Sequence, residues 1–288
     1  MASLRSVLKA DEFVTLPLKK VVVYNHDSST FIFGLPPQTS SKLPVASWIV
    51  VKATDPEALK DKNGNPVIRP YTPLSGADNS GELVLLVMKY DTGVMSKYIH
   101  TLKPGDTLDI KGPIEKFPFT DVLNRMSSSS RAPNLAATEN EFDEVALIGG
   151  GSGITPLYQV STHALASPTN TTKFKLIYSN ITEEDILIRE DIEALAKAHP
   201  DTLEVVYLLG KPKVDWIGVS CCSRGLTGSV RAEAIQKYVA PATTAHTISA
   251  GPPGQVAALA GPKAGKNQGE LGGALKDLGY TAAQVFKF

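Results

Sequence analysis

Cysteine is nearly missing from this chain. The two cysteines among its 288 residues are the neighbours Cys221 and Cys222, which cannot build a disulfide framework. This scarcity fits a reducing compartment. Neither a histidine nor a further cysteine stands at ligand spacing from the pair, so we interpret both as near-surface thiols and predict no metal site.

Long apolar runs and an excess of charge of either sign are absent as well. No segment approaches the ~20 apolar residues of a membrane-spanning helix, and the first residues lack the apolar core of a secretory signal. Lys plus Arg and Asp plus Glu both number 29, so the overall charge gives no reason to expect binding to nucleic acid. We therefore expect the chain, as given, to be soluble.

The chain does have the length and hydrophobic content for two domains, with 288 residues of which 42% are hydrophobic. Between residues 119 and 143 the pattern fades into a serine-rich stretch that includes Pro133 and Asn134 and is typical of a loop. We therefore predict a first domain at 1–118, a linker at 119–143 and a second domain at 144–288.

The first domain is expected to be an antiparallel β-barrel. Short runs rich in Val, Ile, Leu and aromatic residues alternate with turn signals such as Pro104-Gly105. Strands are predicted at residues 13–24, 30–33, 45–51, 83–90 and 107–111. Several short strands at this spacing are typical of a small barrel, and one helix at 94–102 interrupts them.

The second domain is expected to be α/β, with a Rossmann-like parallel sheet. Strands are predicted at 145–149, 173–178, 203–209 and 246–250, and helices at 156–166, 189–199, 230–238, 253–260 and 269–278. Strands that alternate with helices indicate βαβ units around a parallel sheet. Such sheets bind ligands at the carboxyl ends of their strands.

A glycine-rich segment stands at one such strand end. The apolar run 145–148 leads directly into GGGSG at 149–153, and a helix follows from Thr155 or Pro156. Glycines let the backbone approach a pyrophosphate closely, and a helix N-terminus supplies free N–H groups. The segment predicts a dinucleotide site, and the alternative is a strand–helix turn without a ligand.

Two further segments follow strands of the same sheet. Carboxylates at 183–185 could accept hydrogen bonds from an adenosine ribose and repel a 2′-phosphate. They could equally be the acidic start of a helix. Gly251-Pro252-Pro253 opens a helix after a later strand, or merely ends that strand.

The first domain carries its own candidate segment, Arg69-Pro70-Tyr71-Thr72, at a strand edge. An arginine can hold a diphosphate through two parallel hydrogen bonds. Tyr71, two residues on in an extended chain, points to the same side, and Thr72 offers a hydroxyl to the reactive edge of a flavin. The helix that starts after Gly93 is a second candidate phosphate site. The alternative is an ordinary strand with a surface arginine and a half-buried tyrosine.

Together, these segments resemble the NADH–cytochrome b5 reductases, within the ferredoxin-reductase-like flavoproteins. The resemblance runs from about residue 13 to the end of the chain. It rests on His26-Asp27, RPYTPLS at 69–75, VMKY at 87–90, GVMSKYIHTLKPGD at 93–106, KGPIEKF at 111–117, GGGSGITPLYQ at 149–159, TEEDILIRED at 182–191 and GPPG at 251–254. The tail at 267–288 is similar to the fungal mitochondrial-type branch.

The resemblance implies a site residue by residue. It implies FAD contacts for Arg69, Pro70, Tyr71, Thr72, Val87, Lys89, Gly93, Met95, Ser96 and Thr155. It implies NADH contacts for Gly150, Gly151, Gly153, Asp185, Gly251 and Pro252. Thr72 and His26 match residues proposed to tune the flavin and its proton traffic, and are the catalytic candidates. A lone histidine is a poor functional signal by itself, so His26 could instead be a loop or capping residue.

The chain departs from the family at one position. The family usually reads Cys-Gly-Pro-Pro where this chain has Ala250-Gly251-Pro252-Pro253, so the thiol beside the nicotinamide is missing. In the family that thiol assists placement and is not a covalent catalyst. We therefore expect its loss to affect the rate and the nicotinamide affinity more than the type of reaction.

The activity implied by the resemblance is hydride transfer from NADH to FAD, followed by single-electron transfer to cytochrome b5. The implied location is the mitochondrial outer membrane or intermembrane space, through an anchor outside this sequence, and the alternative is the cytoplasm. Lys97, His100, Lys111 and Lys116 either form a positive patch for an acidic haem protein or merely solvate the barrel. Two other functions stay open: a reductase that serves a quinone, a nitrate-reductase centre or an iron–sulfur protein, and a nucleotide-binding module without flavin.

Overall fold

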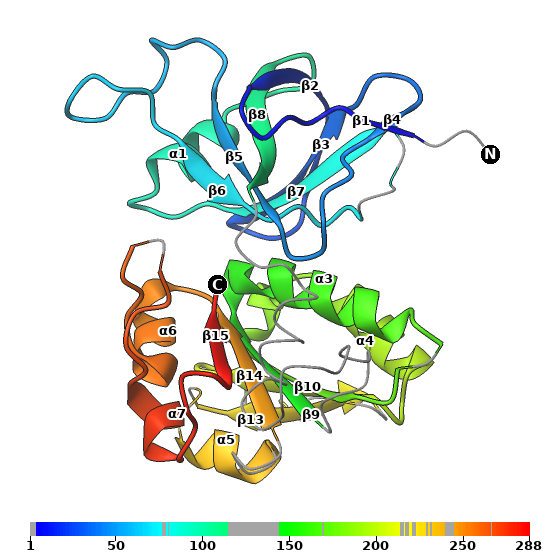
Figure 1. Cartoon of the computed structure of the whole chain (residues 1–288), viewed down its shortest axis with the longest axis vertical. Helices are drawn as coiled ribbons and strands as arrows, with labels where there is room; N and C mark the ends of the chain where they lie inside the picture. Colours follow the sequence, from blue (N-terminus) through cyan, green and yellow to red (C-terminus); the bar gives the residue numbers. More distant parts are fainter. Residues whose placement is uncertain are drawn as a thin grey trace, which may run out of the picture. The chain divides into compact units, whose positions relative to one another are not determined.

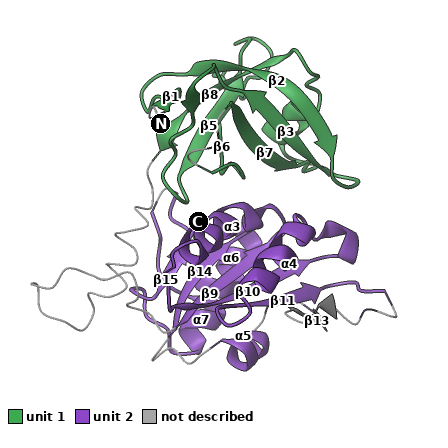
Figure 2. Cartoon of the chain, turned by 90° about the vertical axis from the view of Figure 1, so that its right-hand side faces the viewer, with its two compact units in different colours: residues 1–119 green, residues 120–288 purple. Residues whose placement is uncertain are grey.

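The chain forms two compact units, residues 1–119 and 120–288, drawn in different colours in Figure 2. The structure, a computed structural model, describes residues 4–76, 79, 81–114, 144–168, 170–213, 216, 219–220, 223–228, 230, 232–239, 245–265 and 267–288. The linker predicted at 119–143 and the two cysteines lie outside the described residues.

The first unit is built on a six-stranded sheet in which every pairing is antiparallel, as predicted. The strand order is β6-β5-β8-β2-β3-β7 (Figure 1). The bounds are β2 Val14–Val23, β3 Ser28–Gly34, β5 Trp48–Ala53, β6 Arg69–Tyr71, β7 Glu82–Met88 and β8 Thr107–Ile114. The same unit contains a separate two-stranded parallel sheet, formed by β1 Arg5–Ser6 and β4 Thr39–Ser40.

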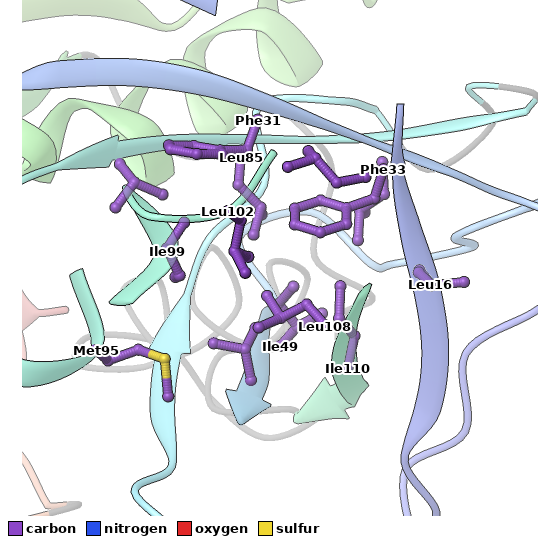
Figure 3. Packing of buried hydrophobic residues seen from close by; sticks show 14 of the residues in the cluster. Leu16, Phe31, Phe33, Ile49, Leu85, Met95, Ile99, Leu102, Leu108 and Ile110 are labelled. Carbon is purple, nitrogen blue, oxygen red and sulfur yellow. The ribbon is translucent and has the colours of Figure 1, made fainter. Parts of the chain in front are cut away.

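The segment after β6 joins the two ends of this sheet. The Leu74 N–H donates to the Val84 carbonyl of β7 at 2.8 Å, and the Val84 N–H donates to Ser75 Oγ at 3.1 Å. The sheet therefore curls around one hydrophobic core, in which Phe31, Phe33 and their neighbours converge (Figure 3). Burying each such side chain contributes ~1.5–3 kcal/mol, so this core fixes the strands that carry Arg69 and Tyr71.

The helix of the first unit, α1 Val94–Ile99, is shorter than the predicted 94–102. After Ile99 the chain turns, with the Thr101 N–H donating to Tyr98 O and the Leu102 N–H to Ile99 O. Strand β5 likewise begins at Trp48, later than the predicted residue 45, because Ala46 has a φ of 59° that an extended strand does not allow.

The second unit is a seven-stranded sheet in the order β12-β13-β11-β10-β9-β14-β15. All pairings are parallel except that of β12 with β13 at one edge. The strands are β9 Glu144–Gly150, β10 Lys173–Asn180, β11 Leu203–Leu209, β12 Val219–Ser220, β13 Ser223–Thr227, β14 Ala245–Ala250 and β15 Val285–Lys287. The helices are α3 Ile154–Leu165, α4 Arg189–Ala198, α5 Ala232–Tyr238, α6 Pro253–Ala260 and α7 Gly273–Asp277, with short 3-10 turns at Gly151–Gly153 and Glu183–Asp185.

Helices cover both faces of this sheet, as the predicted βαβ pattern requires (Figure 1). Ala146 and Ile148 of β9 pack in one cluster with residues of α5, α6 and α7. The alternate residues of the strand point to the other face, where α3 contacts β9 and α4 contacts β11. Strand β9 is buried along its whole length, which fits a central parallel strand.

The second unit differs from the sequence-based expectation in its short strands and its last helix. Strands β12, β13 and β15 were not predicted, and the last helix begins at Gly273 rather than at residue 269. The later start has a backbone cause, because Gly269 has a φ of 68°, outside the right-handed helical region. In the described part of the chain, no helix has the length and apolar character to span a bilayer.

Candidate functional site

The glycine-rich segment forms a tight strand–helix connection in the second unit. Strand β9 ends at Gly150, the turn Gly151–Gly153 follows, and α3 begins at Ile154. Gly151 has a φ of 50°, a left-handed conformation that is open to glycine at little cost. Thr155, in the first turn of α3, is buried, and its hydroxyl donates to Ser152 O at 3.2 Å. The free N–H groups of this 12-residue helix are thus presented at the carboxyl end of the central strand.

This loop meets the loop that follows β14. The two strands are neighbours, with Ala250 opposite Gly149. A Cβ added at Gly153 would come within 2.5 Å of Ala250 C and Gly251 N, both of them main-chain atoms. A Cβ at Gly251, which has a φ of 155°, would lie 3.1 Å from Gly150 N. The structure therefore brings the residues 150–153 and 250–252 into one cradle of main-chain groups, in which a side chain at Gly153 has no room.

The acidic segment is tied to the same loop through Tyr178, a residue that the sequence analysis did not single out. The Tyr178 hydroxyl donates to Gly151 O at 2.9 Å and accepts from the Leu187 N–H at 3.3 Å. The ring is fully buried between these elements. The signal available in the sequence, a tyrosine at the end of the strand predicted at 173–178, does not reveal these partners.

Each predicted ribose-side carboxylate has a protein partner. Asp185 Oδ2 accepts from the N–H and the hydroxyl of Thr182, both at 2.8 Å, in a capping box. Glu183 is paired with Arg189, and Glu184 with Lys213 at 3.0 Å. The helix-start interpretation therefore holds in the structure, and it leaves the acidic charge in place beside the ends of β10 and β11.

The Gly-Pro-Pro segment opens helix α6, with Pro252 in the N-cap position and Pro253 as the first helical residue. One turn into this helix, the Gln255 side chain lies against Gly150 and accepts a hydrogen bond from Ser179 Oγ at 3.4 Å. Gln255 thus joins the ends of β9, β10 and β14, and it too was missed by the sequence analysis. Ala250, in the place of the family's cysteine, is buried at the end of β14.

In the first unit, the predicted flavin segment is the edge strand β6, paired with β5 alone. Arg69 is exposed, and its Nη1 donates to the neighbouring Ile68 O at 2.8 Å. Tyr71 is half-buried and packs against the barrel core. Burial raises the pKa of Tyr71 to about 12, with Tyr90 adding to the rise and Arg69 opposing it. Thr72 follows directly and is half-buried. An exposed guanidinium beside a neutral ring fits the diphosphate and the ring system of FAD.

The start of α1 is organised by Ser96, whose buried hydroxyl accepts from the Tyr90 N–H and donates to Gly93 O, both at 3.2 Å. A Cβ at Gly93 would collide with this hydroxyl. Val87 and Met95 point into the barrel core. Any contact of these two positions with a cofactor must therefore come from their main-chain groups.

His26 occupies the exposed turn between β2 and β3, with Nε2 3.6 Å from Asp27 Oδ2. The Lys89 N–H donates to Asp27 O at 2.7 Å, which attaches this turn to the end of β7. The fold thereby brings His26 and Lys89, 63 residues apart in sequence, to neighbouring positions. Both side chains are exposed there.

Of the four residues considered for a positive patch, the structure does not place all on an exposed surface. Lys97 is exposed, as expected. His100 does not belong to an exposed patch, because its Nε2 lies 2.9 Å from Val87 O and its ring packs edge-on against Phe31. Lys111 Nζ lies 4.8 Å above the ring of Phe13, and Lys116 is outside the described residues. Among the described residues, no group of three or more His, Cys, Asp or Glu side chains is arranged to hold a metal ion.

Two family models match the chain, one in each compact unit. The oxidoreductase FAD-binding domain matches residues 15–119, and the oxidoreductase NAD-binding domain matches residues 147–260.

Curated relatives match over almost the whole chain. The protein named NADH-cytochrome b5 reductase 2 from Mycosarcoma maydis is 43% identical over 98% of this chain and 74% of its own length. Its namesake from Debaryomyces hansenii is 40% identical over 96% of this chain and 84% of its own length. Among solved structures, the cytochrome b5 reductase domain of Ulva prolifera nitrate reductase is similar with a TM-score of 0.73 and 25% identity, over 98% of this chain and 100% of that one.

The glycine cradle yields a matched pair of variants. Gly153→Ala should destabilise the fold by ~1–3 kcal/mol, because the new Cβ would meet main-chain atoms of β14 that cannot move without distorting the sheet. Gly254→Ala, in helix α6, should cost nothing, since a Cβ there would meet no atom of another element within 4 Å. Urea unfolding followed by circular dichroism measures both. Equal losses for the two variants would contradict the close main-chain approach.

Proposed function

The chain belongs to the NADH–cytochrome b5 reductase family, and on this premise we propose that it transfers hydride from NADH to FAD and then passes single electrons to cytochrome b5. The first unit is the FAD-binding domain of an oxidoreductase and the second is the NAD-binding domain. The cofactor is therefore FAD, and the electron donor is NADH.

The observation that carries this proposal is the main-chain cradle at the ends of β9 and β14. A pyrophosphate needs N–H donors and close approach, and the loops at 150–153 and 250–252 offer both because Gly153 excludes a side chain. Tyr178 links this cradle to the Leu187 N–H, two residues beyond the carboxylates at 183–185. A site of this kind fits a dinucleotide whose adenosine ribose carries no 2′-phosphate.

The reaction divides between the cofactor and the chain. When bound, FAD accepts two electrons as a hydride and can give them up singly. The chain's residues hold and orient the reactants. Arg69 would grip the diphosphate, and the Gly93–Ser96 turn would present main-chain groups to it. Thr72 and His26 are proposed to tune the flavin edge, Thr72 through its hydroxyl and His26 through proton exchange at its exposed ring.

We also propose that the protein works at the mitochondrial outer membrane or in the intermembrane space. The support is the likeness of the tail at 267–288 to the fungal mitochondrial-type branch. Organelle fractionation of cells that make the native protein tests this, and recovery in the cytosolic fraction alone would contradict it.

The first test of the function is the absorbance of the purified protein. It should be yellow, and anaerobic NADH should bleach it, after which addition of oxidised cytochrome b5 should restore the colour. A colourless protein would instead favour a nucleotide-binding module without flavin. Faster reduction of a quinone or of an iron–sulfur protein than of cytochrome b5 would favour another acceptor.

Arg69→Ala should weaken FAD retention about ten- to a hundredfold, because it removes a charge-assisted contact worth ~1.5–3 kcal/mol. Arg5→Ala is the matched control, since Arg5 is an exposed arginine of the same unit on strand β1. The flavin content of each variant is measured after gel filtration. The dissociation constant for FAD is then measured by titration of the apoprotein. Unchanged retention in Arg69→Ala would remove this residue from the site.

The protein should prefer NADH over NADPH, and Asp185→Asn should narrow that preference at least about fivefold, or ~1 kcal/mol. The asparagine oxygen can still accept from Thr182, so the capping box survives while the charge is lost. Asp185→Ala serves as the comparison, because it loses the cap as well. The ratio of kcat/KM for the two dinucleotides is the measurement. If the wild type uses both equally well, the carboxylates do not select the cofactor.

Reduction of cytochrome b5 should slow as ionic strength rises, because docking to an acidic partner through exposed lysines is screened by salt. Lys97→Glu should slow it even at low salt, whereas Lys20→Glu, an exposed lysine on β2, should not. An uncharged small acceptor should show neither effect. A cytochrome rate that ignores both salt and Lys97→Glu would place docking elsewhere.

A further inference from the structure

The side chain of Lys287, the next-to-last residue, is buried with 2% exposure, which is rare for a lysine. Its Nζ lies within hydrogen-bond distance of four main-chain carbonyl oxygens, which share the three N–H donors of the ammonium group: Ala260 at 3.2 Å, Gly261 at 3.4 Å, Pro262 at 3.5 Å and Glu270 at 3.1 Å. Among the described residues, no carboxylate is paired with it. The charge is thus held by carbonyl dipoles alone, as a desolvated monovalent cation is held in a cage of oxygen atoms.

The cage is built on the C-terminal end of helix α6. Ala260 is the last residue of the helix, and Gly261 ends it with a φ of 82°. The last carbonyls of a helix have no partners within it and carry its partial negative charge, so a cation at this end is favourable. Lys287 therefore caps α6 from a strand that is distant in sequence.

The fourth carbonyl is delivered by the loop that returns after α6. Gly261 and Gly269 both have positive φ, and a Cβ at Gly261 would lie 2.6 Å from Glu270 O. The Gln268 side chain then fixes the main chain of Lys287, accepting from its N–H at 2.7 Å and donating to its carbonyl at 3.0 Å. Both the backbone and the ammonium of Lys287 are consequently bound to the segment after α6.

Burial lowers the pKa of Lys287, which means that desolvation works against the charged form. The four carbonyl oxygens offset this cost, because they accept hydrogen bonds from the ammonium group. Removal of the charge alone would leave the Ala260 carbonyl with the Gly272 N–H as its donor at 3.0 Å, and would take the ammonium donor away from the Gly261, Pro262 and Glu270 carbonyls. The end of α6 would then have to shift to satisfy them.

The other end of α6 begins at Gly251-Pro252, in the candidate dinucleotide site. A helix of eight residues is about 12 Å long, and its continuous main-chain hydrogen bonds connect the end held by Lys287 to the end at Pro253. We propose that Lys287 is a positioning residue, whose ammonium group acts as a built-in monovalent cation that holds α6 and so sets Gly251-Pro252 for NADH. The proposal rests on the proposed function, because it assumes that NADH binds at this end.

The test replaces Lys287 in the FAD-loaded protein and measures the dissociation constant for NAD+ by titration calorimetry. Lys287→Met keeps most of the side-chain volume without the charge, and should weaken NAD+ binding at least about fivefold, equal to ~1 kcal/mol at 1.4 kcal/mol per decade. The flavin content should not change, since FAD is held by the first unit. Lys276→Met is the matched control: Lys276 is exposed and lies 3.6 Å from the side chain of Glu270, and its loss should leave NAD+ binding unchanged.

Chemical rescue separates positioning by charge from simple packing. Lys287→Ala leaves a cavity at the cage, so methylammonium should recover at least half of the lost binding free energy. Tetramethylammonium at the same ionic strength is too large and cannot donate hydrogen bonds, and it should recover none. Lys287→Met should respond to neither ion, because its side chain fills the space.

Three outcomes would overturn the positioning role: unchanged NAD+ binding in Lys287→Met, equal loss in Lys276→Met, or rescue that does not distinguish the two ions. If neither Lys287 variant folds, Lys287→Gln decides, because its amide can still donate hydrogen bonds to the carbonyls but carries no charge. NAD+ binding should then weaken at least about twofold, and unchanged binding would overturn the proposal. A wild type that binds no NAD+ would instead refute the proposed function itself.

Discussion

The second unit depends on the close approach of two main-chain segments, residues 150–153 and 250–252. Because β9 and β14 are adjacent parallel strands in register, their carboxyl ends bring both loops to one point. The loops can meet only if Gly153 carries no side chain. The missing side chain at Gly153 permits the contact and also leaves main-chain N–H groups open to a ligand. The close packing and the affinity for a pyrophosphate therefore both follow from this glycine.

Buried polar side chains hold the loops around this cradle. Tyr178 ties the glycine loop to the acidic segment, Gln255 joins three strand ends, and Lys287 fixes the far end of α6. A buried polar group that loses its partner costs ~1–3 kcal/mol, so each of these residues favours one loop geometry over its alternatives. In the first unit the hydrophobic core has this role, since the side chains of Val87 and Met95 pack in it and so anchor β7 and α1.

Local patterns predicted the elements that are long or strongly punctuated. The apolar run into GGGSG gave β9 and the start of α3, and the two runs of β-rich residues around Asn25 gave β2 and β3. Short elements were missed, because they have too few residues to show a pattern. Strand β15, for example, has three residues and draws its stability from pairing with β14. His100 was assigned to a surface patch because helical spacing places it near Lys97, whereas the packing against Phe31 decides where its ring lies.

The sequence by itself determined the order of the two domains, the family and the segments that could bind each cofactor, because glycines, prolines and alternating apolar residues act through local backbone geometry. Only the tertiary structure decided which of these segments meet and which polar side chains hold them. A lysine in a short C-terminal strand looks like a solvated residue in the sequence. It becomes a buried cap for α6 because four carbonyls, from residues 260–262 and 270, converge on it, and that convergence exists only in the folded chain.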